Sequence, residues 1–193
     1  MAGRLADARA AIDAANANDP NTIVVDGVER PKELAHAEMM SAWVERLDPV
    51  ATDAQRLAAR AHHLRRWTLP RSSYPEGRAG YLRWRTALRK QHAEEVAGLI
   101  EGAGYGPDVI GRVQAIIRKE GLGSDPQVQV HEDALCLVFL ETQLAATADD
   151  LGDEKMVDVI RKTVAKMSEQ GVAHVAALPL RPHDRELIAQ ALA

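Results

Sequence analysis

The sequence predicts an all-α protein, and two observations support this fold class. Apolar residues recur at helical spacing in nearly every segment, whereas no segment shows a convincing alternation of apolar and polar residues. Proline and glycine divide the chain at intervals that suit helices of ordinary length. With 193 residues, of which 46% are apolar, the chain can form a sizeable core, and we expect one helical domain over residues 1–193.

The first third of the chain carries clear helix boundaries. Asn18, Asp19 and Pro20 end the first helix, and an irregular segment then leads to Pro31, which is well placed to open the second. Thr52 is a suitable N-cap for the third. These three helices are expected over residues 4–17, 32–47 and 52–67.

Residues 68–80 are the least helical part of the sequence. They contain Pro70, Pro75, Gly77 and Gly80, and we expect them to cross the surface as a loop. Further helices are expected over residues 81–103, from Pro107 to just before Gly121, from Pro126 through the apolar run around residue 136, and in two or three segments that close the chain with breaks near Gly171 and at 179–182.

Charge and composition exclude several classes of protein. No stretch approaches the roughly 20 apolar residues needed to cross a bilayer, and the N-terminus has no contiguous apolar run typical of a signal peptide, so we expect a cytoplasmic protein. The net charge of −4 argues against general nucleic-acid binding. The single cysteine, Cys136, lies in an apolar run and is expected to be a small core residue.

A basic segment stands out against this acidic average. Nine Lys or Arg residues lie between Arg60 and Lys90, with Glu76 as the only acid among them. Guanidinium groups bind phosphate or carboxylate bidentately, so the segment predicts an anion site. The alternative is a loop held to the body by tryptophan packing, with its arginines paired to acids elsewhere. The preferred anion contacts are Arg71, Arg78 and Arg85.

Several helical segments carry side chains that are typical metal ligands. His36, the adjacent pair His62 and His63, His92 and Asp133 occur at positions where three or more could converge on one ion. The alternative for each is a buried histidine that serves as a hydrogen-bonded structural residue. The other three histidines are expected at the surface: His131, His174 and His183.

Three stretches resemble the histidine-aspartate (HD) superfamily of helical metallohydrolases. HAEMMSAWVERLDPVATDAQRLAARAHHLRRW is similar to its first ligand helix and the adjacent ligand pair, and HAEEVAGLIEGAGYGPDVIGRVQAIIRK is similar to a later segment that begins with histidine. EDALCLVFLE resembles the final helix, which carries the last aspartate. The similarity covers about residues 32–141 and implies an HD-domain-like helical bundle.

A closer resemblance is to a family of bacterial and fungal proteins catalogued only as a domain of unknown function. The stretches RAHHLRRW, LPRSSYPEGRAGYLRWR and EDALCLVFLE carry it. Some fungal members are labelled glutamyl-tRNA synthetase, but this chain has no nucleotide-binding motif of such an enzyme.

The resemblance to the HD superfamily implies a role for each matching residue. His36 would be the first metal ligand, His62 the histidine of the pair, and Asp133 the last ligand. His63 stands where the superfamily has aspartate, and His92 corresponds to an extra histidine of dinuclear members.

Two departures from the superfamily pattern put a dinuclear centre in doubt. The signature aspartate that bridges two metals is replaced by histidine, and a second extra histidine would fall near Arg118 or Lys119, where a cation repels a second metal. The acidic residue that assists catalysis in some members is also missing, because Arg65 and Arg66 follow the pair.

The leading expectation is a metal-dependent hydrolase of a small phosphorylated, nucleotide-like substrate. A Mn, Fe, Ni or Zn ion on the three implied ligands would lower the pKa of a bound water. His63 or His92 would orient that water or move its proton, and the three preferred arginines would neutralise phosphate charge. One alternative is an iron-dependent oxygenase, and another is a non-catalytic module that binds RNA or a small anion.

Overall fold

The structure is a computed structural model that describes residues 3–25 and 27–193, and it is predominantly helical. The expected all-α class is therefore confirmed. The N-terminal helices are α1 (Arg4–Asn16), α2 (Lys32–Leu47), α3 (Asp53–Arg60), α4 (Gly77–Gly102), α5 (Pro107–Arg118) and α6 (Pro126–Thr142). The C-terminal helices are α7 (Leu144–Leu151), α8 (Asp153–Val164), α9 (Glu169–Ala173) and α10 (Pro182–Leu192).

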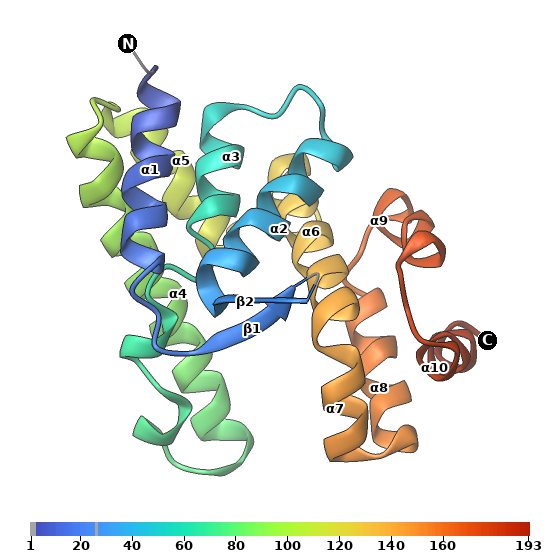
Figure 1. Cartoon of the computed structure of the whole chain (residues 1–193). Coiled ribbons are helices and arrows are strands. Elements are labelled where there is room, and N and C mark those ends of the chain that lie inside the picture. Colours follow the sequence, from blue (N-terminus) through green and yellow to red (C-terminus); the bar gives the residue numbers. More distant parts are fainter. Residues whose placement is uncertain (1–2, 26) are drawn as a thin grey trace.

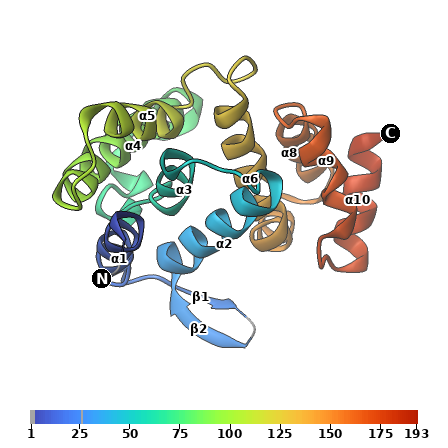
Figure 2. The ribbon, with the colours of Figure 1, turned by 90° about the horizontal axis from the view of Figure 1, so that it is seen from above.

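The buried apolar side chains form two separate core clusters. One joins α1, α3, α4 and α5, and it contains Leu57, Val96 and Ile116. The other joins α2 with α7, α8 and α10, and it contains Met40 and Ile160. Helix α6 belongs to both clusters, and Figure 2 shows it between α3 on one side and α8 on the other. The central helices α2, α3 and α6 therefore meet where the two cores adjoin.

Two short strands lie where the sequence predicted an irregular segment over residues 21–31. Strands β1 (Thr22–Val25) and β2 (Val28–Pro31) pair antiparallel, with Ile23 opposite Arg30. Gly27 has a φ of +77°, which glycine adopts without steric cost. The Asp-Gly dipeptide before β2 is a frequent hairpin connection and was the available sequence signal.

Helix α3 ends at Arg60, seven residues before the expected end at Trp67. Beyond Arg60 the chain continues in tight turns. In these turns a backbone amide donates to the carbonyl oxygen three residues earlier, as the amide of Leu64 does to Ala61. Arg65 has a left-handed φ of 49°, and its amide donates a 3.0 Å hydrogen bond to the Asn16 side chain. A contact with α1 therefore sets this end, and it leaves His62 and His63 outside the regular helix.

Helix α4 begins earlier than expected, inside the segment predicted to be a loop. Short 3₁₀ turns at Arg66–Thr68 and Arg71–Ser73 precede it, and Gly77 starts it with a φ of +82°. A Cβ atom on Gly80 would lie 1.8 Å from the Pro75 carbonyl oxygen, so this turn requires glycine. Basic residues of this segment, such as Arg66 and Arg71, therefore lie in short 3₁₀ turns that precede the start of α4.

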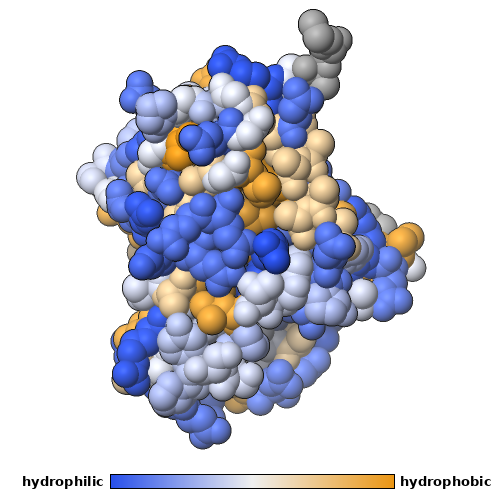
Figure 3. Space-filling view, turned by 90° about the vertical axis from the view of Figure 1, so that its left-hand side faces the viewer, coloured by the Kyte–Doolittle hydropathy of each residue, from blue (hydrophilic) through white to orange (hydrophobic). Residues whose placement is uncertain are grey.

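Figure 3 shows the side of the molecule formed by the N-terminal helices, where hydrophilic residues cover most of the face and strongly apolar residues occupy only small areas. Among the described residues, no helix combines the length and the apolar character needed to cross a membrane.

Candidate metal centre and adjoining cavity

Five histidine rings gather where α2, α4 and α6 meet the turns that follow α3. The rings of His36 and His63 are stacked with centroids 4.2 Å apart, and those of His62 and His63 lie 4.5 Å apart. His131 lies 4.8 Å from His62, and His92 lies 6.1 Å from His63. The early end of α3 explains how two adjacent histidines join one cluster, because regular helix would direct them about 100° apart.

Hydrogen bonds fix the tautomer or the partner of three of these rings. His92 donates from Nδ1 to the Leu64 carbonyl oxygen at 2.8 Å, which leaves its Nε2 as a lone-pair donor directed into the protein. His62 Nδ1 lies 2.8 Å from His131 Nε2, so one of these two rings donates to the other. A ring N–H bonded to a backbone carbonyl is the usual way in which proteins orient a metal-binding histidine.

Glu33 supplies a carboxylate to the cluster. Its Oε2 lies 3.0 Å from His63 Nδ1, and Arg66 donates to the other ring nitrogen of His63 at 3.2 Å. Because Nε2 of His63 accepts from Arg66, its proton is on Nδ1 and points at Glu33. Burial raises the pKa of Glu33 to about 7, against the opposing charge of Arg66. Glu33, His36 and His63 offer ligand atoms that all lie within 4.8 Å of one another.

Several buried ring nitrogens of the cluster have no hydrogen-bond partner among the described residues. These are both nitrogens of His36, Nε2 of His92 and Nδ1 of His131. An unpaired buried polar group is costly, so a concentration of them needs a reason such as a bound ion. Burial lowers the pKa of His36 to about 3 and that of His92 to about 4, so both rings are neutral at physiological pH. Neutral imidazoles with free lone pairs fit a transition-metal ion.

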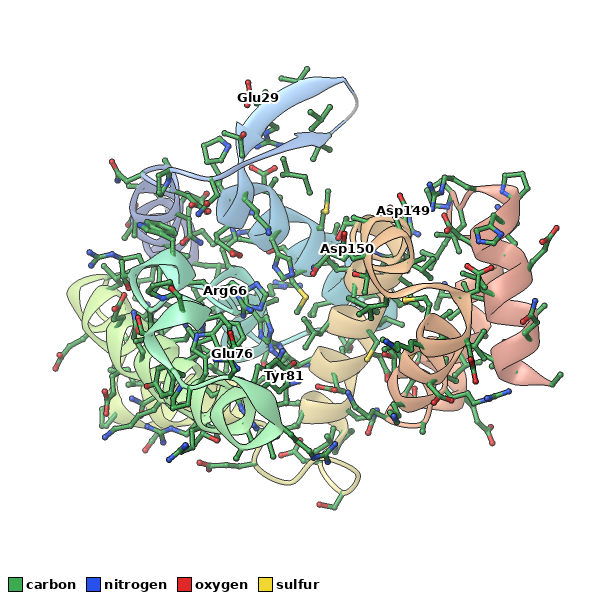
Figure 4. The ribbon with its side chains drawn as sticks, turned by 90° about the horizontal axis from the view of Figure 1, so that it is seen from below. Glu29, Arg66, Glu76, Tyr81, Asp149 and Asp150 are labelled. Atoms are coloured by element: carbon green, nitrogen blue, oxygen red, sulfur yellow. The ribbon has the colours of Figure 1, made fainter. Side chains whose placement is uncertain are left out.

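A cavity of about 390 Å³ adjoins the histidines. His63 lies in its wall, and apolar side chains of α6 and α8 form another part of the wall. Figure 4 shows Arg66 and Tyr81 on the side of α4 that faces α6. The cationic side chains in the wall are Arg66, Arg85, Lys119, Lys162 and Lys166, and among the described residues the only carboxylate there is Glu132.

Two of these cations are held rigidly beside the histidines. The Arg66 guanidinium lies over the Trp84 ring, 4.8 Å from its centroid, and the Trp84 indole donates to the Leu69 carbonyl at 2.9 Å. Lys119 caps α5 with a left-handed φ of 62° and is paired with the buried Glu132. Because cations flank neutral imidazoles, the arrangement favours an anionic molecule within reach of the cluster.

The structure places Asp133 away from the group of metal-type ligands. Its carboxylate accepts hydrogen bonds from the backbone amide and the hydroxyl of Ser168 and from the side-chain amide of Gln129. Asp133 therefore anchors the start of α9. His131, two residues earlier, was expected at the surface, but only 1% of it is exposed and it contacts His62. That expectation was wrong. His183 is exposed as expected, and His174 is partly buried against Trp43.

The three arginines preferred from the sequence have different positions. Arg85 lines the cavity, 5.9 Å from the Tyr81 ring. Arg71 instead donates to the carbonyl oxygens of Tyr74 and Pro75, which holds the loop before α4 together. Arg78 is exposed and is not in the cavity wall. Cys136 is buried as expected, and burial raises the pKa of its thiol to about 12.

Sequence reasoning missed Glu33, Arg66 and Lys119 as parts of the site. Glu33 had a signal, because it precedes His36 by three residues and therefore shares its helix face. Arg66 was counted in the basic segment and noted as a replacement for an acid, but it was not among the preferred anion contacts. The structure supplies an acid to His63 from α2 instead.

A family model described as "Domain of unknown function (DUF4202)" matches residues 6–188. No curated protein and no solved structure matches the chain.

Proposed function

We propose that this chain, which belongs to the DUF4202 family, is a metal-dependent hydrolase of a small phosphorylated substrate. One observation carries the proposal: His63 belongs both to the group of metal-type ligands and to the wall of the cationic cavity. An ion bound at that group and a phosphate bound in the cavity would therefore be neighbours. This adjacency is what phosphoester hydrolysis by a metal-activated water needs.

The residues that would hold the ion are Glu33, His36 and His63, with His92 as an additional nitrogen donor. The donor set suits Mn, Fe, Ni or Zn. When bound, such an ion lowers the pKa of a coordinated water and so supplies a nucleophile at neutral pH. For His63 to hold the ion through Nδ1, the proton on Nδ1 would move to Nε2, and the Arg66 guanidinium would turn away from that nitrogen.

The remaining residues of the site would bind the substrate and move protons. Arg66, Arg85 and Lys119 would bind the phosphoryl oxygens and neutralise the charge that develops on them. The hydrogen-bonded pair of His62 and His131 would accept and pass on the proton of the attacking water. This assignment replaces Asp133 and Arg71, whose polar groups are occupied by structural hydrogen bonds.

The test is metal content and hydrolysis measured on the same preparations of the full chain. We expect stoichiometric transition metal in the wild type and a loss of metal in His36→Ala and in His63→Ala. Removing a ligand should lower the hydrolysis of para-nitrophenyl phosphate at least roughly 100-fold. His183→Ala is the matched control, because that histidine is exposed and remote from the cluster. Unchanged metal content in both ligand variants would refute the ligand assignment.

A second candidate function is supported by the composition of the ligand group. Two histidines and one carboxylate form the ligand set used by many non-haem iron oxygenases. Iron as the bound metal, with oxygen consumption and no phosphate release, would select this function. A chain without bound metal, indifferent to chelators, would instead be a module that binds an anion or RNA.

A further inference from the structure

The cations of the cavity come from two sides of α6. Arg66, Arg85 and Lys119 form the first group, which lies on the side of α4 and α5 (Figure 2). Arg66 donates a 3.2 Å hydrogen bond to His63, and Lys119 is paired with Glu132, which follows His131 in α6. This group therefore borders the candidate metal centre.

Lys162 and Lys166 form the second group. They lie near the end of α8, on the far wall from α4, and both are exposed to solvent. The Cys136 thiol of α6 lies 3.8 Å from the carbonyl oxygen of Thr163, which stands between these two lysines in the sequence. The second group therefore lies on the side of α6 that faces α8.

An apolar strip lies in the cavity wall along α6, the helix that Figure 2 shows between α4 and α8. Leu135 and Phe139 of α6 and Val159 of α8 contribute to it, and each is only partly buried by the rest of the protein. Apolar side chains at the mouth of a cavity gain free energy when a ligand covers them. The wall thus offers cations at two places with an apolar surface between them.

The cations of the cavity lack counter-charges of their own. The carboxylate of Glu132 in the wall is paired with Lys119. Arg85, Lys162 and Lys166 form no ion pair with any carboxylate in the part of the chain that the structure describes. Bringing several unpaired cations to one hollow raises the local concentration of anions, and a ligand with more than one anionic group satisfies more of them than a single phosphate does.

We propose that the cavity binds a substrate with two separated anionic groups joined by an apolar body. The reacting phosphoryl group lies at Arg66, Arg85 and Lys119, an assignment that rests on the proposed function. The second anionic group lies at Lys162 and Lys166, and the body covers the strip formed by Leu135, Phe139 and Val159. A bisphosphate therefore binds more tightly than the monophosphate with the same body.

The test compares hexanediol bisphosphate with hexyl phosphate by isothermal titration calorimetry on the full chain. We expect the wild type to bind the bisphosphate roughly 5- to 30-fold more tightly, since the second phosphate adds contacts with two lysines. In Lys162→Ala/Lys166→Ala the two affinities should become equal, while hexyl phosphate keeps its wild-type affinity. Both lysines are exposed, so the variant retains the core.

The control variant, Lys155→Ala/Arg161→Ala, removes two cations from the same helix outside the cavity wall and should keep the preference for the bisphosphate. Equal affinities in the wild type, or the same loss of preference in the control, would overturn the inference. Binding is measured with and without a chelator, and it requires no turnover of the ligand. A chain that prefers the bisphosphate but holds no metal would therefore refute the proposed hydrolase and leave the two-group binding site standing.

Discussion

The buried pair of Lys119 and Glu132 allows a quantitative test of the site. Their side chains are 9% and 3% exposed, and each is the other's ionic partner. Removing one charge leaves the other buried without compensation, which typically costs about 3–5 kcal/mol. The pair lies in the wall of a cavity that admits water, so we expect Glu132→Gln to lower the free energy of unfolding by about 3 kcal/mol, at the lower end of that range.

The double variant Lys119→Met/Glu132→Leu should recover most of that loss, because an apolar pair of similar size carries no desolvation cost. Urea denaturation followed by circular dichroism of the wild type, Lys119→Met, Glu132→Leu and the double variant gives the four free energies of the double-mutant cycle. The exposed pair of Asp158 and Arg161 is the control, and its removal should cost at most about 0.5 kcal/mol. A loss below about 1 kcal/mol in Glu132→Gln, or additive losses in the double variant, would show that the pair is not buried as described.

Asp125 caps α6, and its hydrogen bond to Arg112 holds its pKa at about 2, below the ordinary 3.8. The stability that Asp125 contributes is therefore present above pH 3.8 and lost as the pH falls toward about 2. In Asp125→Asn, the free energy of unfolding should fall less steeply over this pH range than in the wild type. The same pH dependence in both proteins would contradict the capping role of Asp125. Gly80→Ala should lower the free energy of unfolding by about 1–3 kcal/mol, because the new Cβ would collide with the Pro75 carbonyl oxygen. Gly98→Ala, in the same helix but with open space around it, should raise it by about 0.5–1 kcal/mol in thermal denaturation. Equal effects of the two substitutions would show that Gly80 tolerates a side chain. Asp133→Asn should lower stability by about 1–3 kcal/mol yet leave metal content unchanged in elemental analysis, and a loss of metal would restore the ligand role expected from the sequence.

Helix positions were predictable wherever a local signal sets the boundary. The helix expected over residues 32–47 has those bounds in the structure, because Pro31 fixes its start, and Pro107 and Pro126 likewise open α5 and α6. The end of α3 was not predictable, because it depends on a hydrogen bond from the Arg65 amide to Asn16, which is distant in sequence.

The candidate site was predictable in its location and less so in its membership. The sequence pointed to His36, His62, His63 and His92, and the structure brings these rings together, while their binding of a metal stays a proposal. It could not decide which side chain of the run from residue 131 to 133 faces them, since successive helix positions point about 100° apart. The packing of α6 between two cores makes that choice.

The position of the histidines between the two core clusters has a consequence for folding. His36 is on α2 in one core, His92 is on α4 in the other, and α6 spans both. A ligand that joins these rings would link the two core clusters directly. In the loaded protein, amide hydrogen exchange should therefore slow in α4 and α8 together, as a single cooperative unit, although neither core gains an apolar contact.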